Sequence, residues 1–110
     1  MRFRVTILPR AKIDIDQNAD WWADHHSTDQ AVKWSDAIYD QIETLTAFPE
    51  SNALSAENGR FPYEIRDKLV GLGSRKTYRA VFTIKDDEVF VLTVRAAEED
   101  RLSPDDVDFD

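Results

Sequence analysis

Residues 75–95 read RKTYRAVFTIKDDEVFVLTVR, and this stretch decides the fold. Read at a period of two, Tyr78, Ala80, Phe82 and Ile84 alternate with Arg79, Val81 and Thr83, and Val89, Val91 and Thr93 are interleaved with Phe90, Leu92 and Val94. This period is typical of β-strands, and Asp86-Asp87 between the two runs predicts a tight reversal. Because both runs carry apolar residues on both faces, we expect a β-hairpin at the centre of a sheet.

The N-terminal residues predict a strand followed by a helix. Phe3, Val5 and Ile7 alternate with Arg4, Thr6 and Leu8. One face is thus more apolar than the other, which is typical of a short strand, and Pro9 ends it. From Ala11 the period changes, because apolar residues at 15, 19 and 22 fall on one side of a helix. We expect this helix to end near residues 25–27.

A second helix is predicted directly after the first. Ser27 or Thr28 is placed to cap it, and Gln30 three residues after Ser27 resembles a capping box. An apolar stripe follows at helical spacing, and Phe48-Pro49 ends the helix. The stripe consists of Ala31, Trp34, Ile38, Ile42 and Leu45.

The rest of the chain completes an α+β domain. Residues 50–62 are expected to form a loop, 63–69 a strand of mixed polarity and 71–74 a turn. The order is therefore β-α-α-β-β-β, with a mainly antiparallel four-stranded sheet and the helical hairpin packed on one face. We assign residues 1–101 to one domain and 102–110 to an acidic C-terminal tail, of which 105–110 is expected to be frayed.

Composition excludes several functional classes. The chain has 110 residues, no cysteine and a net charge of −8, so thiol chemistry is excluded and tight binding to DNA by the chain alone is not expected. Charge is uneven, because residues 59–95 carry eight basic against five acidic side chains. No signal peptide or membrane span is apparent, which predicts a cytoplasmic protein. His25-His26 and the aspartate-rich stretches lack the spacing of metal ligands, so we expect neither metal nor cofactor.

Short sequence features follow one another in a fixed order across residues 1–101. They are Pro9 and Ala11; Ala31 and Trp34; Ile42, Leu45 and Pro49; residues 54–57 (LSAE); Glu64-Ile65-Arg66; residues 78–82 (YRAVF); and residues 89–95 (VFVLTVR). The ordered set resembles the RelE/ParE toxin superfamily, and more closely its ParE-like plasmid stabilisation branch. This resemblance implies the toxin of a type II toxin–antitoxin system, with a groove beside the sheet that an extended antitoxin segment covers. RelE-like members cleave messenger RNA on the ribosome, whereas the ParE-like branch is linked to inhibition of DNA gyrase.

Candidate catalytic residues for RNA cleavage are Arg66, Arg79 and Arg95, because such cleavage needs cations to stabilise the phosphorane. An alternative role for Arg79 is a structural salt bridge with Glu57 or Glu64. Active ribonuclease members carry further acids or cations after the last strand, but here Arg95 is followed by two alanines and acidic residues. Cleavage is therefore disfavoured, and we expect a gyrase-type target reached by protein–protein contact.

Candidate partner-binding residues are the basic side chains of the predicted sheet and one tryptophan that lies off the apolar stripe. They are Arg66, Lys68, Arg75, Lys76, Arg95 and Trp21. The expected partners are a cognate antitoxin and DNA gyrase. Two alternatives remain open, a ribosome-dependent messenger RNA endoribonuclease and a non-toxic homologue that only binds antitoxin.

Overall fold

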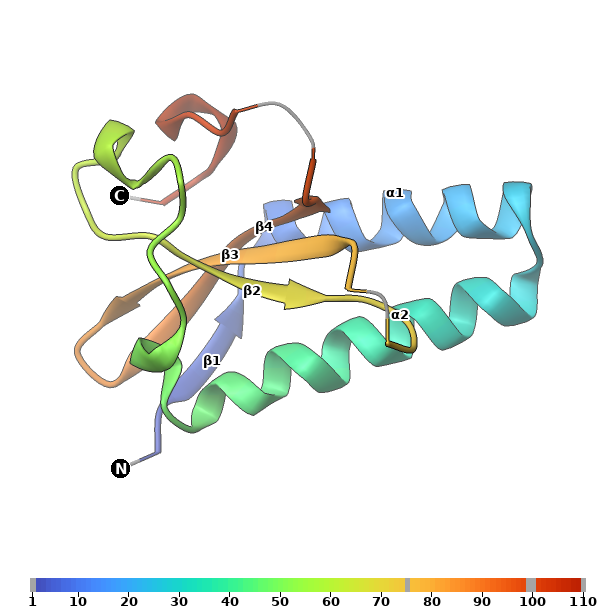
Figure 1. Ribbon diagram of the computed structural model, residues 1–110, viewed down its shortest axis with the longest axis horizontal. Helices are drawn as coiled ribbons and strands as arrows, with labels where there is room; N and C mark the ends of the chain where they lie inside the picture. Colours follow the sequence, from blue (N-terminus) through green and yellow to red (C-terminus); the bar gives the residue numbers. More distant parts are fainter. Residues whose placement is uncertain (1, 75, 99–100, 110) are drawn as a thin grey trace.

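The structure is a computed structural model that describes residues 2–74, 76–98 and 101–109. It confirms the predicted order and the α+β class (Figure 1). The sheet order is β1-β4-β3-β2, with β1 parallel to β4 and the other two pairs antiparallel. The main elements are β1 (Arg4–Ile7), α1 (Pro9–His25), α2 (Thr28–Glu43), β2 (Arg66–Val70), β3 (Tyr78–Lys85) and β4 (Glu88–Ala96).

The hairpin of β3 and β4 forms the centre of the sheet, as its two apolar faces predict. Its reversal lies at Asp86 and Asp87, and Asp86 adopts a left-handed backbone conformation with φ of 59°. This conformation suits aspartate better than most residues, since Asn and Asp are enriched there. The register between the two strands shifts between Val81 and Phe82, which pair with Thr93 and Val91, so that Leu92 is skipped.

The two helices pack on one face of the sheet. The Ser27 side chain caps α2 by accepting a hydrogen bond from the Gln30 backbone N–H at 3.1 Å, as predicted. All five residues of the predicted stripe are buried, and four of them, Trp34, Ile38, Ile42 and Leu45, pack with residues of the sheet in one hydrophobic cluster. Trp22 is only half-buried, but it packs against this core and donates a hydrogen bond from Nε1 to the Tyr78 hydroxyl at 3.3 Å.

The strand predicted for residues 63–69 begins later, at Arg66. Ile65 is bonded to the preceding loop instead, since its N–H donates to the Asn58 side chain and its carbonyl accepts from Ser55. The Leu54–Arg66 bridge fastens the same loop to the outer edge of β2. These contacts fix the loop against the edge strand.

The C-terminal residues cover the second face of the sheet, so the prediction of a frayed tail was wrong for the described part. Leu102 is fully buried and Val107 nearly so. They pack with Phe61, Ile65, Val81 and Leu92 in a second hydrophobic cluster. Alternation along residues 102–110 is weak and acidic residues dominate, which hid these apolar contacts from sequence reasoning.

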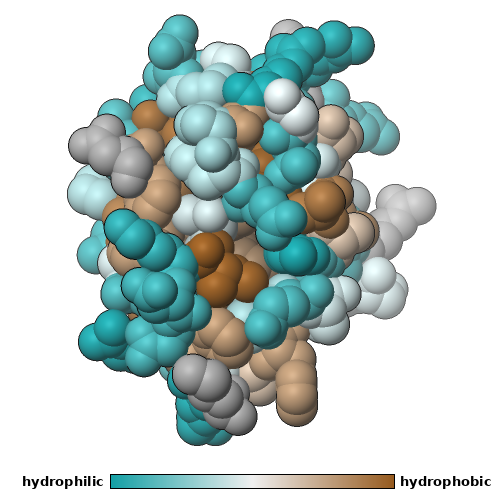
Figure 2. Space-filling view, turned by 90° about the vertical axis from the view of Figure 1, so that its left-hand side faces the viewer, coloured by the Kyte–Doolittle hydropathy of each residue, from teal (hydrophilic) through white to brown (hydrophobic). Residues whose placement is uncertain are grey.

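Figure 2 shows the side of the molecule where the long loop and the β3–β4 reversal lie. Apolar surface appears there as patches between hydrophilic side chains. Across the described residues, none of the helices has the length and apolar character that a membrane crossing requires.

Candidate functional site

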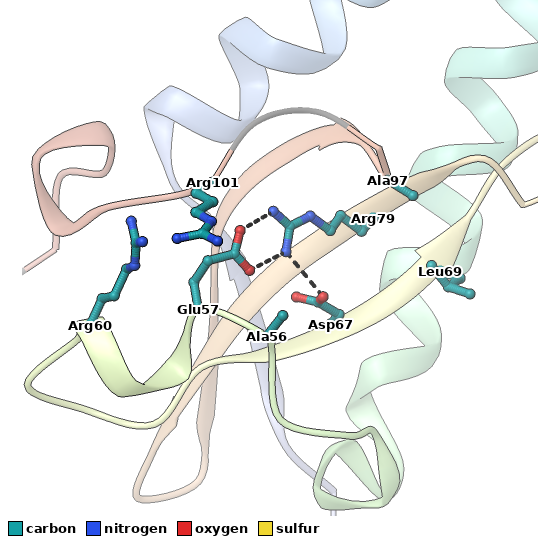
Figure 3. Close-up of a pocket in the computed structure, with 8 residues that line it drawn as sticks. All are labelled: Ala56, Glu57, Arg60, Asp67, Leu69, Arg79, Ala97 and Arg101. Atoms are coloured by element: carbon teal, nitrogen blue, oxygen red, sulfur yellow. Dashed lines mark hydrogen bonds and ion pairs between the residues drawn. The ribbon is translucent and has the colours of Figure 1, made fainter.

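Arg79 lies in the interior of a charged cluster beneath a surface pocket (Figure 3). Its guanidinium forms two hydrogen bonds to the Glu57 carboxylate, Nη2–Oε2 at 2.6 Å and Nη1–Oε1 at 2.9 Å. Nη1 also lies 3.1 Å from Oδ2 of Asp67. The side chain of Arg79 is only 6% exposed, so the candidate catalytic cation is enclosed by two carboxylates.

The electrostatics of the cluster follow from this pairing. The hydrogen bond from Arg79 lowers the pKa of Glu57 to about 2, against the opposing effect of burial. The bond to Glu57 raises the pKa of Arg79. Glu57 also accepts hydrogen bonds from the Leu102 N–H at 2.9 Å and the Ser55 hydroxyl at 3.0 Å. Of the two salt bridges left open by the sequence, the one with Glu57 forms.

The pocket above this cluster has a volume of about 530 Å³. Arg60 and Arg101 lie at its loop side, and Leu69 and Ala97 lie across the ion pair from them (Figure 3). Both arginines are exposed, and the Leu69 side chain on the edge strand is 57% exposed. The pocket therefore joins exposed cations and an apolar side chain. Sequence reasoning missed Arg60, Arg101 and Asp67, because they lie in separate segments that only the fold brings together.

Arg66 is occupied by bonds within the chain. Its Nη1 donates to the carbonyls of Glu50 at 3.2 Å and Asn52 at 2.6 Å. Its Nη2 lies 3.6 Å from the exposed Glu64 carboxylate. Arg66 thus holds the loop after α2 against the edge strand. Lys68 is partly buried two residues further along β2, and Arg75 lies outside the described residues.

Trp21, Lys76 and Arg95 are brought to one region by the fold, although they are far apart in sequence. Trp21 and Lys76 line a pocket of about 460 Å³, together with Trp22, Tyr78 and Ala96. Trp21 also lines a second pocket of about 310 Å³, whose walls include Arg95, Arg10 and Asn18. We call the region formed by these two pockets the Trp21 surface.

Trp21 is fixed by its neighbours at the end of α1. Its ring stacks on His25 with centroids 4.3 Å apart, and it meets Trp22 edge to face at 5.7 Å. The Trp22 ring stacks on His26 in turn, at 4.6 Å. The two histidines therefore support aromatic rings, and no group of three or more His, Cys, Asp or Glu residues suited to a metal ion occurs in the described part of the chain.

The end of β4 carries few groups for acid–base chemistry. Arg95 is directly opposite Arg79 across the β3–β4 ladder and is half-buried. It is followed by Ala96 and Ala97, and then by Glu98. The end of β4 therefore supplies one cation, Arg95, with no described histidine or tyrosine after it, and the next described cation, Arg101, lies in the pocket above the ion pair.

Comparisons with known proteins agree with this architecture. The family model for the ParE toxin of the type II toxin–antitoxin system parDE matches residues 5–101. A chain from the chromosomal ParDE toxin–antitoxin system of P. aeruginosa has a TM-score of 0.72 at 20% identity, over 88% of this chain and 98% of that chain. A mutant of the E. coli toxin RelE in the free state has a TM-score of 0.52 at 22% identity, over 89% of this chain and 86% of that one. No curated protein matches the sequence.

The two structural matches share the fold with this chain. The family model spans both helices and all four strands, except for Arg4 at the start of β1. The match ends at residue 101, where the segment that covers the second face of the sheet begins. The ordered features found in the sequence all lie within or next to the matched range. The chain belongs to the ParE toxin family of type II toxin–antitoxin systems.

Proposed function

We propose that this toxin arrests growth through protein–protein contact with a gyrase-type target, and not by cleaving RNA. The observation that carries the proposal is the burial of Arg79 between Glu57 and Asp67. A cation that stabilises a phosphorane has to face the substrate with its charge available. Arg79 instead directs its two terminal nitrogens at carboxylates of its own chain.

The groups around Arg79 support the same conclusion. Arg66 is bonded to loop carbonyls, and Arg95 is followed by two alanines where a ribonuclease needs further acids or cations. A net charge of −8 also opposes accumulation at RNA. A protein target needs no catalytic set, so the ParE-like mechanism is compatible with all three features.

We further propose that a cognate antitoxin neutralises the toxin in the cytoplasm by covering the pocket beside β2. Arg60 and Arg101 offer cations to acidic side chains of such a segment, and Leu69 offers an apolar contact. The edge strand β2 lies beside this pocket and contributes Asp67 and Leu69 to its lining. An antitoxin encoded by the neighbouring gene is the expected partner.

The test is induced expression in a bacterium, with and without the neighbouring gene. We expect growth arrest with intact messenger RNA, inhibition of supercoiling by purified DNA gyrase, and rescue by the antitoxin. Mapping transcript ends on ribosomes separates the two mechanisms. Cleavage at ribosome-bound codons, with gyrase unaffected, would show that the protein is a ribonuclease and that the proposal is wrong.

A further inference from the structure

The Trp21 surface combines an exposed aromatic side chain, which packs against neighbouring rings, with two pockets that it lines. The Trp21 side chain is 46% exposed although tryptophan is usually buried in a domain core. Its ring is held by His25 and Trp22, and the Trp22 ring is anchored by its bond to Tyr78. An exposed side chain that already packs against neighbouring rings loses less conformational entropy when a partner covers it than one without such contacts, which favours binding.

The two hollows differ in polarity. The pocket of about 460 Å³ is walled by rings of Trp22 and Tyr78 and by Ala96, so it accepts an apolar side chain. The pocket of about 310 Å³ is walled mainly by polar groups, including Arg10, Arg95 and Asn18. A segment that lies across Trp21 therefore meets an apolar hollow on one side and guanidinium groups on the other.

Charge around Trp21 differs from that of the whole molecule. Among the described residues that line the two pockets, three are basic and two are acidic, in a chain whose net charge is −8. One of the two acids, Asp14, is already bonded to the Thr93 hydroxyl and the Val94 N–H and lies 3.4 Å from Arg10. This ion pair engages one charge of each sign, so Lys76 and Arg95 against Glu98 leave the two pockets with one net positive charge. One net positive charge in an acidic chain favours a carboxylate of the partner at this surface.

We propose that the Trp21 surface is the site that contacts the toxin's protein target, and that it binds an exposed segment with a carboxylate next to an aliphatic or aromatic side chain. The proposal rests on the function proposed above. Tryptophan and arginine are the residues most enriched among those that dominate binding energy at protein interfaces. The pocket above Arg79 lies on the β2 side and is a separate candidate for the antitoxin. If the antitoxin bound the Trp21 surface instead, it would be the alternative occupant that the experiment has to distinguish from the target.

The experiment compares wild type, Trp21→Ala and Ile13→Ala for growth arrest on induction. Ile13 is a matched control, because it lies on the same helix, is 50% exposed and lines neither pocket. Purified variants are then tested for inhibition of gyrase supercoiling and for antitoxin binding. We expect Trp21→Ala to raise the toxin concentration for half-inhibition at least tenfold, while Ile13→Ala and antitoxin binding stay within about twofold of wild type.

A second variant keeps the test independent of Trp21 packing. Arg10→Gln removes a cation whose side chain is 47% exposed, while the less exposed Asp14 keeps its bonds to the Thr93 hydroxyl and the Val94 N–H, so the fold is retained. We expect several-fold weaker inhibition and a smaller dependence on salt. Circular dichroism and thermal unfolding confirm that each variant is folded.

The outcomes of these assays distinguish an error in the assigned surface from an error in the proposed function. Growth arrest that is unchanged in folded Trp21→Ala and Arg10→Gln would overturn the assignment of this surface, whatever the target. Loss of antitoxin binding with arrest intact would assign the surface to the antitoxin and also overturn it. Transcript cleavage by wild type, with gyrase unaffected, would overturn the proposed function and this inference with it. Arrest that depends on Trp21, with transcripts intact and gyrase unaffected, would support the surface and show that gyrase is not the target.

Discussion

Replacing Glu57 with glutamine tests the buried ion pair directly. Glutamine keeps the shape of the side chain and one acceptor oxygen, but it removes the charge that pairs with Arg79. The hydrogen bond from Arg79, with smaller contributions from the Leu102 N–H and the Ser55 hydroxyl, lowers the pKa of Glu57 from 4.5 to about 2, a difference of about 2.5 pKa units. At about 1.4 kcal/mol per unit, this difference corresponds to roughly 3 kcal/mol of stability. Removing one partner of a buried pair costs a similar amount, about 3–5 kcal/mol, because the other charge remains buried.

The pH dependence has a definite sign. The folded-state pKa of Glu57 is lower than the unfolded value, so the carboxylate stabilises the fold fully above about pH 5. The stabilisation is lost as the pH falls from 4.5 towards 2, because protonation removes the charge. Glu57→Gln resembles the protonated form at every pH. The difference in unfolding free energy between wild type and Glu57→Gln should therefore be about 3 kcal/mol at pH 7 and shrink towards zero near pH 2.

Urea unfolding at several pH values measures both quantities. For a domain of this size, about 3 kcal/mol corresponds to a fall in melting temperature of at least 10 °C. Glu64→Gln is the matched control, since Glu64 is 70% exposed and lies 3.6 Å from Arg66 in a surface pair. We expect it to change the unfolding free energy by less than about 0.5 kcal/mol. Equal small effects of the two substitutions at pH 7 would refute the reasoning.

Three further predictions concern other parts of the fold. Phe48 has a φ of 52°, precedes Pro49 and is 78% exposed, so Phe48→Gly should raise the urea midpoint by relieving backbone strain worth about 1 kcal/mol. Leu102 and Val107 are buried, so truncation after Arg101 removes two apolar side chains from the core. At roughly 1.5–3 kcal/mol for each of them, the free energy of unfolding should fall by several kcal/mol. An unchanged melting temperature would show that the segment contributes nothing. Arg66→Ala should release residues 50–54, because Arg66 donates to two carbonyls of this segment. Faster hydrogen exchange of the Asn52 and Ser55 backbone N–H groups would reveal the release. Lys68→Ala is the control and should leave both exchange rates unchanged.

Most of the fold could be predicted from the sequence because local patterns agree with the tertiary structure. The alternation in residues 78–95 and the stripe from Ala31 to Leu45 each have a single period, and both segments are buried as that period requires. The prediction that a strand starts at Tyr63 was wrong, because β2 begins at Arg66. The mixed polarity of residues 63–65 reflects contacts with the loop, and not the alternating faces of a strand.

The sites were less predictable because they depend on contacts between distant segments. The sequence showed Arg79 among apolar residues and suggested a structural partner, but Asp67 and the Leu102 N–H joined that cluster only in the fold. The six partner-binding candidates were chosen by type. The structure gathers Trp21, Lys76 and Arg95 at one surface. Arg66 and Lys68 lie on the edge strand instead.

Several basic side chains near the sheet form hydrogen bonds or ion pairs within the chain, and this bears on the proposed mechanism. Arg79 is paired with two carboxylates, Arg66 with two carbonyls, and the Lys76 ammonium donates to the carbonyls of Gly71 and Gly73. Three of the basic side chains that make residues 59–95 positive thus have donors engaged within the chain, which leaves fewer donors for contacts with phosphate, although only Arg79 is enclosed by carboxylates. Basic residues near the sheet are therefore poor evidence for RNA binding in this chain. Recognition of a protein through a fixed tryptophan with a few cations beside it needs far less free charge, and the structure supplies that combination at the end of α1.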